Sequence, residues 1–210
     1  MNSHKETVLV LRTCDADGRS RNGFIWPKAG TVACDDWNPE PVCGGGLHGL
    51  PWGEGDGTLL NWREDARWLV VGVDADSVVD IDGDKVKFPR GEVVHYGDRK
   101  SATDYLLVNG AAGKAVVGAV VTVGDKGTAN AGYKGTANAG DGGTANAGDG
   151  GTANAGYKGT ANAGEGGTLI MKWRDGHRYR IATAYVGENG ILPNVRYRVD
   201  KQGKFIEVRD

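Results

Sequence analysis

The sequence predicts an all-β protein with minor helix, in which an octapeptide-repeat β-solenoid lies between a β-rich cap and a C-terminal β-meander. Three observations predict this class. One octapeptide, Gly-Thr-Ala-Asn-Ala-Gly followed by two variable residues, occurs five times without interruption from Gly127 to Gly166. Degenerate copies begin at Ala119 and Gly167. Short strand-like runs separated by Gly, Asp and Pro fill the rest of the chain. We therefore divide the chain into a cap domain at 1–118, a solenoid at 119–168 and a meander cap at 169–210.

The cap domain is expected to be built mainly from strands. The runs that predict them are TVLVLRT, RWLVVGVDADSVVDI, DKVKF and GEVVHY. The stretch from Lys100 to Val108 predicts a short helix, with Ser101 as its N-cap and Asp104 three residues later, the spacing of a capping box. The Gly- and Pro-rich tract at residues 22–57 is expected to be mostly loop.

Five of the six tryptophans lie in or beside this tract: Trp26, Trp37, Trp52, Trp62 and Trp68. Aromatic side chains of this kind can stack on sugar rings or bases. In a domain with few regular strands they more often supply the hydrophobic core, and we prefer that interpretation. Trp37 and Trp52 are kept as candidate ligand-binding residues around Cys43 and His48.

Cys34, Cys43 and His48 form a weak candidate metal site. Their spacing, C-x8-C-x4-H, is not that of a standard zinc knuckle, and a fourth ligand would have to come from Cys14, His95 or an acid. Buried thiols and a hydrogen-bonded histidine explain the same residues. We therefore predict no metal and no cofactor.

The same loop supports an alternative function, a small-ligand-binding or enzymatic cap. Glycines 44–46 could bring backbone N–H groups close to an anionic ligand. A Cys43 nucleophile with His48 as its base is the weaker form of this alternative, because residues five apart in a glycine loop need not face one another. The preferred interpretation is that the protein is not an enzyme.

Alternation along each repeat strand assigns its two faces. Thr128 and Asn130 share one face, and Ala129 and Ala131 share the other. The flanking copies carry Val, Leu or Met at the alanine positions, so the alanine face is the interior. The glycines that bracket each strand are expected to adopt the positive φ that tight turns need. The outer face is predicted to consist of Thr128, Asn130, Thr136, Asn138, Thr144, Asn146, Thr152, Asn154, Thr160 and Asn162.

The number of octads in each coil is the next question. Two octads per coil would give a flat two-sheet roll of three coils, whereas three per coil would give a triangular prism of two coils. The triangle would stack Tyr133 on Tyr157, but an interior of alanine methyl groups fits a thin roll better, so the roll is preferred. A disordered glycine-rich linker is the remaining alternative, and the perfect register of the repeats disfavours it.

Four strands joined by ENG and KQG turns predict the C-terminal meander: TLIMKWRDG, HRYRIATAYVG, ILPNVRYRVD and KFIEVRD. Alternation places Arg178 and Arg180 on one face of the second strand, and Arg196 and Arg198 on one face of the third. If these two strands pair, four arginines share a surface that could bind phosphate or nucleic acid. A solvated sheet face is the default interpretation, so nucleic acid is not a preferred partner.

Composition limits the classes of protein to consider. The 210 residues carry a net charge of −2, distributed over the three segments as −5, −1 and +4. The solenoid therefore lacks the carboxylates that a mimic of DNA would need. The N-terminal run MNSHKETVLVL does not resemble a secretory signal, and no window approaches the roughly 18 apolar residues of a membrane span. Three cysteines, an odd number, fit reduced thiols, and we expect a cytoplasmic location without membrane contact.

The order of these pieces resembles an uncharacterised family of bacterial and phage proteins, a domain of unknown function. The matching pieces are CGGGLHG at 43–49, the octads, and GTLIMKW, YRIATAYVGENGIL and YRVDKQGKFIEV near the C-terminus. The octads are also similar to the repeat units of ice nucleation proteins, with T-x-N where those have T-x-T, and to the β-rolls of trimeric autotransporter heads. The resemblance implies a β-roll with caps and brings no established activity.

These observations favour a non-enzymatic structural or binding protein encoded by a phage or mobile element. Its rigid solenoid would act as a spacer or as a docking surface for a macromolecular partner, such as a host protein that it inhibits. Self-association through the solenoid or the caps is included in this expectation. Besides the ligand-binding cap, the alternative is an ice- or water-ordering surface of Thr and Asn.

Overall fold

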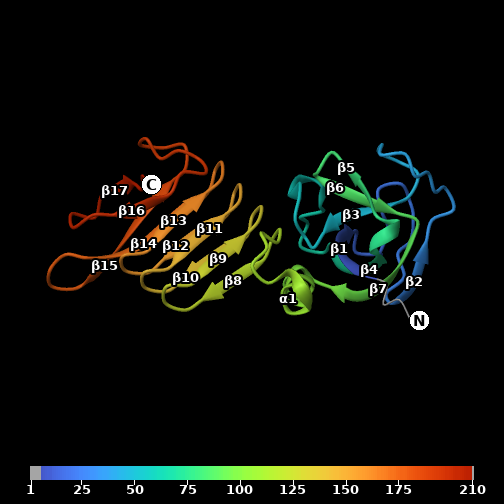
Figure 1. Ribbon diagram of the computed structural model, residues 1–210, viewed down its shortest axis with the longest axis horizontal. Helices are drawn as coiled ribbons and strands as arrows, with labels where there is room; N and C mark the ends of the chain where they lie inside the picture. Colours follow the sequence, from blue (N-terminus) through green and yellow to red (C-terminus); the bar gives the residue numbers. More distant parts are fainter. Residues whose placement is uncertain (1–5, 210) are drawn as a thin grey trace. The chain divides into compact units, whose positions relative to one another are not determined.

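The computed structural model describes residues 6–209, and in this range the chain is built mostly from strands (Figure 1). It falls into two compact units, Met1–Ala112 and Gly113–Asp210, which are described separately. The all-β class with a β-solenoid is confirmed. The division into three parts stays a prediction. In the described range, no helix has the length and apolar character needed to cross a membrane.

The first unit is organised around a seven-stranded antiparallel sheet with the order β2-β7-β4-β1-β3-β6-β5. The central strands β1 and β4 are apolar along most of their length. Val10 and Leu11 of β1 and Leu69 and Val70 of β4 are fully buried. Burial of these side chains is the main driving force for the fold of this unit. The strands are β1 (Thr7–Cys14), β2 (Gly30–Ala33), β3 (Leu47–Pro51), β4 (Arg67–Asp74), β5 (Val79–Ile81), β6 (Lys85–Phe88) and β7 (Arg90–Gly97).

One feature of this sheet differs from the sequence-based expectation, and a second agrees with it. The run RWLVVGVDADSVVDI is not one strand, because the 3-10 turn η2 (Ala75–Ser77) separates β4 from β5 and the Asp74 carboxylate accepts the Asp76 N–H at its start. The tract at residues 22–57 is mostly loop, as expected, although it contains β2 and β3, and the 3-10 turn η1 (Gly57–Leu59) follows it.

The predicted helix is confirmed as α1 (Arg99–Leu106), followed by a π-helical segment, η3 (Leu107–Ala111). Its predicted cap is wrong. The N-cap is Asp98, whose carboxylate accepts the Ser101 N–H at 2.8 Å, while the Ser101 hydroxyl accepts the Asp98 N–H at 3.1 Å. Asp104 instead forms an exposed ion pair with Lys100, one turn earlier on the helix surface.

The core interpretation of the tryptophans is confirmed for two of them. Trp26 and Trp68 are each only 3% exposed. Trp62 is half-buried and meets Trp68 edge to face, with 5.3 Å between ring centroids. Trp37 and Trp52 are also half-buried.

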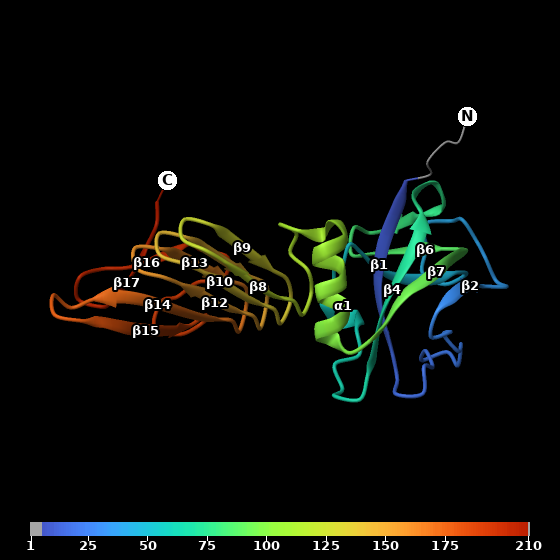
Figure 2. The same cartoon turned by 90° about the horizontal axis from the view of Figure 1, so that it is seen from below.

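The second unit contains a two-sheet β-roll, as predicted (Figure 2). Each coil has 16 residues, because strands pair in parallel with the strand two octads away, so that Thr136 lies opposite Thr152 and Thr144 opposite Thr160. The triangular alternative is therefore wrong, and the ring of Tyr157 lies 5.6 Å from that of Tyr179 rather than on Tyr133. The repeat strands are β8 (Val120–Val123), β9 (Thr128–Ala131), β10 (Thr136–Ala139), β11 (Thr144–Ala147), β12 (Thr152–Ala155) and β13 (Thr160–Ala163).

The alanine face is the interior of the roll, also as predicted. Ala129, Ala145 and Ala161 of one sheet and Ala137 and Ala153 of the other are fully buried. Larger apolar side chains fill the interior next to the C-terminal strands, where Leu169 and Met171 replace the alanines and are nearly inaccessible.

The repeat glycines have a different role from the one expected. The left-handed position of the octad is its eighth residue, occupied by Lys126, Lys134 and Lys158 at φ 51 to 60° and by Gly in the other copies. Glycines that end the strands, such as Gly148, do not have positive φ. A Cβ atom on Gly148 would lie 2.7 Å from the carbonyl carbon of Gly132. These glycines are needed because adjacent coils approach closely there.

The C-terminal segment forms two hairpins rather than one meander. Strands β14 (Thr168–Arg174) and β15 (Tyr179–Tyr185) extend one sheet of the roll, and β16 (Tyr197–Val199) and β17 (Phe205–Glu207) extend the other. Because β15 and β16 belong to different sheets, they do not pair. The predicted four-arginine face of Arg178, Arg180, Arg196 and Arg198 is therefore wrong.

Candidate functional site

The outer rows, defined as the outward Thr and Asn side chains of β9 to β13, form the most regular polar surface of the described chain. Parallel, in-register pairing places each Thr beside a Thr and each Asn beside an Asn of the next coil. One sheet carries the rows Thr128, Thr144, Thr160 and Asn130, Asn146, Asn162, and the other carries Thr136, Thr152 and Asn138, Asn154.

The asparagines of the outer rows are hydrogen-bonded from coil to coil. In one sheet the Asn146 amide donates to Oδ1 of Asn130 at 2.7 Å, and Asn162 donates to Asn146 at 3.1 Å. In the other sheet Asn154 donates to Asn138 at 2.7 Å. Such amide ladders stabilise stacked parallel strands and fix the orientation of every amide.

The threonines of the outer rows are less strongly connected. The hydroxyls of Thr144 and Thr160 are 3.1 Å apart. Both side chains are half-exposed, and Thr128 is exposed. The rows contain hydroxyl and amide groups only, so they can order water or bind a polar surface but hold no base that could activate a hydroxyl.

A second ladder, which sequence reasoning missed, runs through the turns of the roll. The Asp125 carboxylate accepts the Asp141 N–H, Asp141 accepts the Tyr157 N–H, and Asp149 accepts the Glu165 N–H, each at 2.8 Å. The hydrogen bond from Tyr157, followed by one from Lys172, holds the pKa of Asp141 below its usual value. The signal in the sequence is an acidic residue at the seventh octad position that recurs with the 16-residue coil.

Cys43 and His48 both line one cavity of the first unit, but each has a hydrogen-bond partner other than its neighbour. Both line a cavity of about 420 Å³. The Cys43 thiol is exposed and 3.4 Å from Nζ of Lys85, whereas Nε2 of His48 accepts the Gly44 N–H at 3.4 Å. The nucleophile and base pair considered from the sequence therefore has no geometric support.

The candidate metal ligands do not form a metal site among the described residues. Cys34 and Cys14 line the same cavity. Burial raises the pKa of Cys14 to about 11 and also raises the pKa of Cys34, so both are protonated thiols at neutral pH in this structure. Within residues 6–209, no three His, Cys, Asp or Glu side chains come together in a way that could hold a metal ion.

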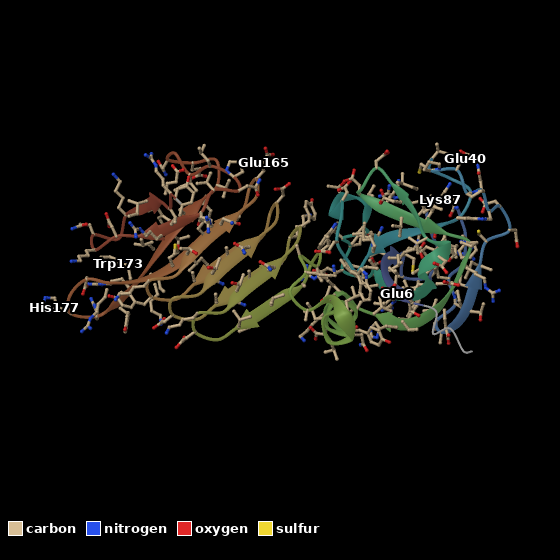
Figure 3. The ribbon with its side chains drawn as sticks, viewed as in Figure 1. Glu6, Glu40, Lys87, Glu165, Trp173 and His177 are labelled. Atoms are coloured by element: carbon tan, nitrogen blue, oxygen red, sulfur yellow. The ribbon has the colours of Figure 1, made fainter. Side chains whose placement is uncertain are left out.

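Lys87, a residue that sequence reasoning missed, holds the glycine loop in place (Figure 3). It is fully buried on β6, and its Nζ donates to the carbonyl oxygens of Val42 at 2.9 Å and Gly44 at 3.2 Å. It also lies 5.8 Å from the ring centroid of Trp37. Trp37 therefore supports this lysine and does not line the cavity. Trp52 does not line it either, since its ring packs close to Gly110.

The four arginines predicted to share a face, Arg178, Arg180, Arg196 and Arg198, are all exposed. Arg180 forms an ion pair with Asp175 at 2.6 Å. Hydrogen bonds from the Arg178 N–H and from Arg180, followed by that from His177, lower the pKa of Asp175 to about 2. This cluster orders the turn between β14 and β15.

Comparisons with known proteins give one family match and several similar proteins. Residues 8–106 match the family model of a domain of unknown function (DUF7666). The ice nucleation protein InaU of Pantoea ananas is 42% identical over 104 residues, which are 49% of this chain and 10% of that protein. An ice nucleation protein of Xanthomonas campestris pv. translucens is 41% identical over 50% of this chain and 7% of that protein.

The chain therefore spans about a tenth or less of the length of these curated relatives. No solved structure matches it. Residues 8–106 are therefore similar to the DUF7666 domain, of unknown function, and about half of the chain is similar to ice nucleation proteins.

Proposed function

We propose that this chain is a non-enzymatic structural repeat protein whose β-roll presents a small, rigid, water-ordering surface. The observation that carries the proposal is the in-register amide ladder, because Asn146 is bonded to Asn130 on one side and to Asn162 on the other. A fixed donor and acceptor array can hold water molecules in a regular arrangement without first having to order its own side chains. The relatives named as ice nucleation proteins support the same proposal.

The small size of the array sets the expected strength of the effect. Neighbouring coils repeat at about 4.8 Å, and alternate residues of a strand are about 6.7 Å apart. The rows with three members are therefore only about 10 Å long, and the rows with two members are about 5 Å long. We expect adsorption to ice that already exists, with little ability to start freezing at temperatures close to 0 °C.

The test is thermal hysteresis, measured on the full chain and on two double variants. The double variant Thr144→Lys, Asn146→Lys disrupts the outer rows of one sheet, and thermal hysteresis should fall strongly. Thr31→Lys with Gln202→Lys introduces the same charges at exposed positions outside the rows, and should leave hysteresis unchanged. Absence of hysteresis in the unmodified chain, or equal loss in both variants, contradicts a water-ordering surface.

A second candidate function is that of a rigid spacer or docking element. The hydrogen-bond ladders favour it because they stiffen the roll. Amide and carboxylate ladders run on both the faces and the turns of the roll. Under this alternative, the Thr144→Lys and Asn146→Lys substitutions lower the melting temperature, because the ladder is broken, and the unmodified chain has no hysteresis. Rapid proteolysis within residues 127–166 would contradict a rigid roll. A docking partner, a phage origin and a cytoplasmic location stay predictions.

A further inference from the structure

The cavity of the first unit has the size and lining of a small-molecule site. Its volume of about 420 Å³ lies within the range of roughly 300–1,000 Å³ in which such ligands are bound. Phe24, Leu59 and Leu60 give it an apolar wall. Leu59 remains 43% exposed, although it is a large apolar side chain.

Arg12 on β1 is an unusual side chain in this lining. Its Nη1 donates to the His48 carbonyl at 2.6 Å, and its Nη2 donates to the Ser20 hydroxyl at 2.8 Å. The guanidinium carbon lies 4.7 Å from the ring centroid of Trp26, which holds the group by a cation-π contact. Nε of Arg12 is buried and has no hydrogen-bond partner, the only such side-chain atom found between residues 6 and 209.

The charge of Arg12 is also uncompensated. Among the described residues no carboxylate lies within ion-pair distance of it. Burial lowers its pKa to about 10, so it stays charged at neutral pH. A largely buried charge without a carboxylate partner is costly, and charged groups in such environments are common at functional sites.

The other charged residues around the cavity increase the positive potential. The Asp15 carboxylate is used by its own loop, where Oδ1 accepts the N–H groups of Asp17 at 3.1 Å and Arg19 at 2.7 Å. The lining includes four basic and two acidic residues: Arg12, Arg19, Arg21, Lys85, Asp15 and Asp36.

We infer that this cavity binds a small organic anion, a carboxylate or a phosphate monoester with an apolar body. The anionic group bonds to Arg12, whose planar guanidinium suits both kinds of oxyanion, and Lys85 adds a second positive charge. The apolar body packs on Phe24, Leu59 and Leu60 and covers the exposed leucine. This site is independent of the outer rows and of the function proposed for them.

The experiment is a calorimetric titration of the full chain with four probes: phenyl phosphate, benzoate, inorganic phosphate and benzylamine. At least one aromatic anion should bind saturably, with the better of the two identifying the preferred headgroup. Inorganic phosphate should bind more weakly because it lacks the apolar body, and benzylamine should not bind. Arg12→Met should weaken the binding about tenfold. Arg90→Met, at an exposed arginine that begins β7, should not change it.

Three results would overturn the proposal. They are no saturable binding of either aromatic anion up to about 10 mM, equal binding of benzylamine, or unchanged affinity in a folded Arg12→Met variant. If Arg12→Met does not fold, Lys85→Met decides instead. This substitution removes a nearby positive charge and should weaken binding of the aromatic anion about threefold. Unchanged affinity in the Lys85→Met variant overturns the proposal.

Discussion

At the scale of single residues, His48 shows how a side chain that looked catalytic is used to build a loop. Burial, and then the charges of Arg12 and Lys85, lower its pKa. Its ring is therefore neutral at pH 7, and its Nε2 can accept the Gly44 N–H. Lys87 holds the same glycine loop from the other side. A neutral histidine held in this way positions the backbone and is not available as a base.

The lowered pKa makes stability depend on pH. In the unfolded chain His48 binds a proton near pH 6.5, whereas in the folded chain it does so only at lower pH. Between these two values the unfolded state holds more protons, so the free energy of unfolding falls as pH falls. The melting temperature should therefore be lower at pH 5 than at pH 7.5. His48→Gln, which keeps an acceptor, should remove part of this dependence, as measured by calorimetry.

His177 is the matched control for this experiment. It lies exposed in the turn between β14 and β15 (Figure 3). His177→Gln should leave the pH dependence of the melting temperature as it is in the unmodified chain. An equal effect of the two substitutions would show that the lowered pKa of His48 is not the cause.

At the scale of elements, the start of α1 offers a measurable cap. The Asp98 carboxylate accepts a hydrogen bond from the Ser101 N–H, one of the free donors of the first turn. This hydrogen bond holds the pKa of Asp98 below its usual value. Asp98→Ala should lower the free energy of unfolding by about 1 kcal/mol in urea denaturation. Asp104→Ala removes only an exposed ion pair with Lys100 and should cost less. Equal losses would contradict the capping role.

The close approach of coils in the roll gives a second prediction at this scale. A methyl group on Gly148 would meet the backbone of Gly132 at 2.7 Å, where nothing can move aside. Gly148→Ala should therefore lower the free energy of unfolding by about 1–3 kcal/mol. Gly124 also lacks positive φ, but a Cβ there meets nothing within 4 Å. Gly124→Ala should be neutral or slightly stabilising, and a comparable loss there would contradict the explanation.

The elements also show which parts of the fold can be predicted from sequence. The inner and outer faces of the roll follow from local alternation, because Ala129 and its equivalents are replaced by large apolar residues in the flanking units. The 16-residue coil follows from the volume of the interior. In contrast, β2 is four residues long and reads GTVA, so only its pairing with β7 makes it a strand. Such pairing between distant segments has no local signal.

The two candidate sites, the outer rows and the cavity of the first unit, differ in how far the sequence predicts them. The outer rows follow directly from the repeats, and the CGGGLHG loop pointed to the right region of the first unit. Arg12 was not identifiable, because an arginine within TVLVLRT has the pattern of an ordinary outward residue of a strand. Its importance depends on the burial of its Nε and on Ser20 and Trp26, which lie on a different segment.

At the scale of the whole molecule, the two units are built in different ways. The core of the first unit joins residues from distant strands, such as Val10 and Phe88. The core of the second unit is a stack in which each repeat strand contacts only its neighbours. A structure of the second kind tolerates a change of length, since every added coil makes the same contacts as the coil before it.

This property predicts the effect of lengthening the roll by one coil. A second copy of residues 135–150, inserted after Gly150, adds one strand to each sheet. The copy of Asp141 then has the same separation from Lys172 along the chain as Asp141 has now, so their ion pair can be kept. The melting temperature should stay the same or rise, β content in circular dichroism should increase, and hysteresis should grow because each row gains a member. An insert of the same 16 residues in shuffled order should form a loop, lower the melting temperature and leave hysteresis unchanged. Equal behaviour of the two inserts would mean that the regular order of Thr and Asn along the roll is not what stabilises it or acts on water.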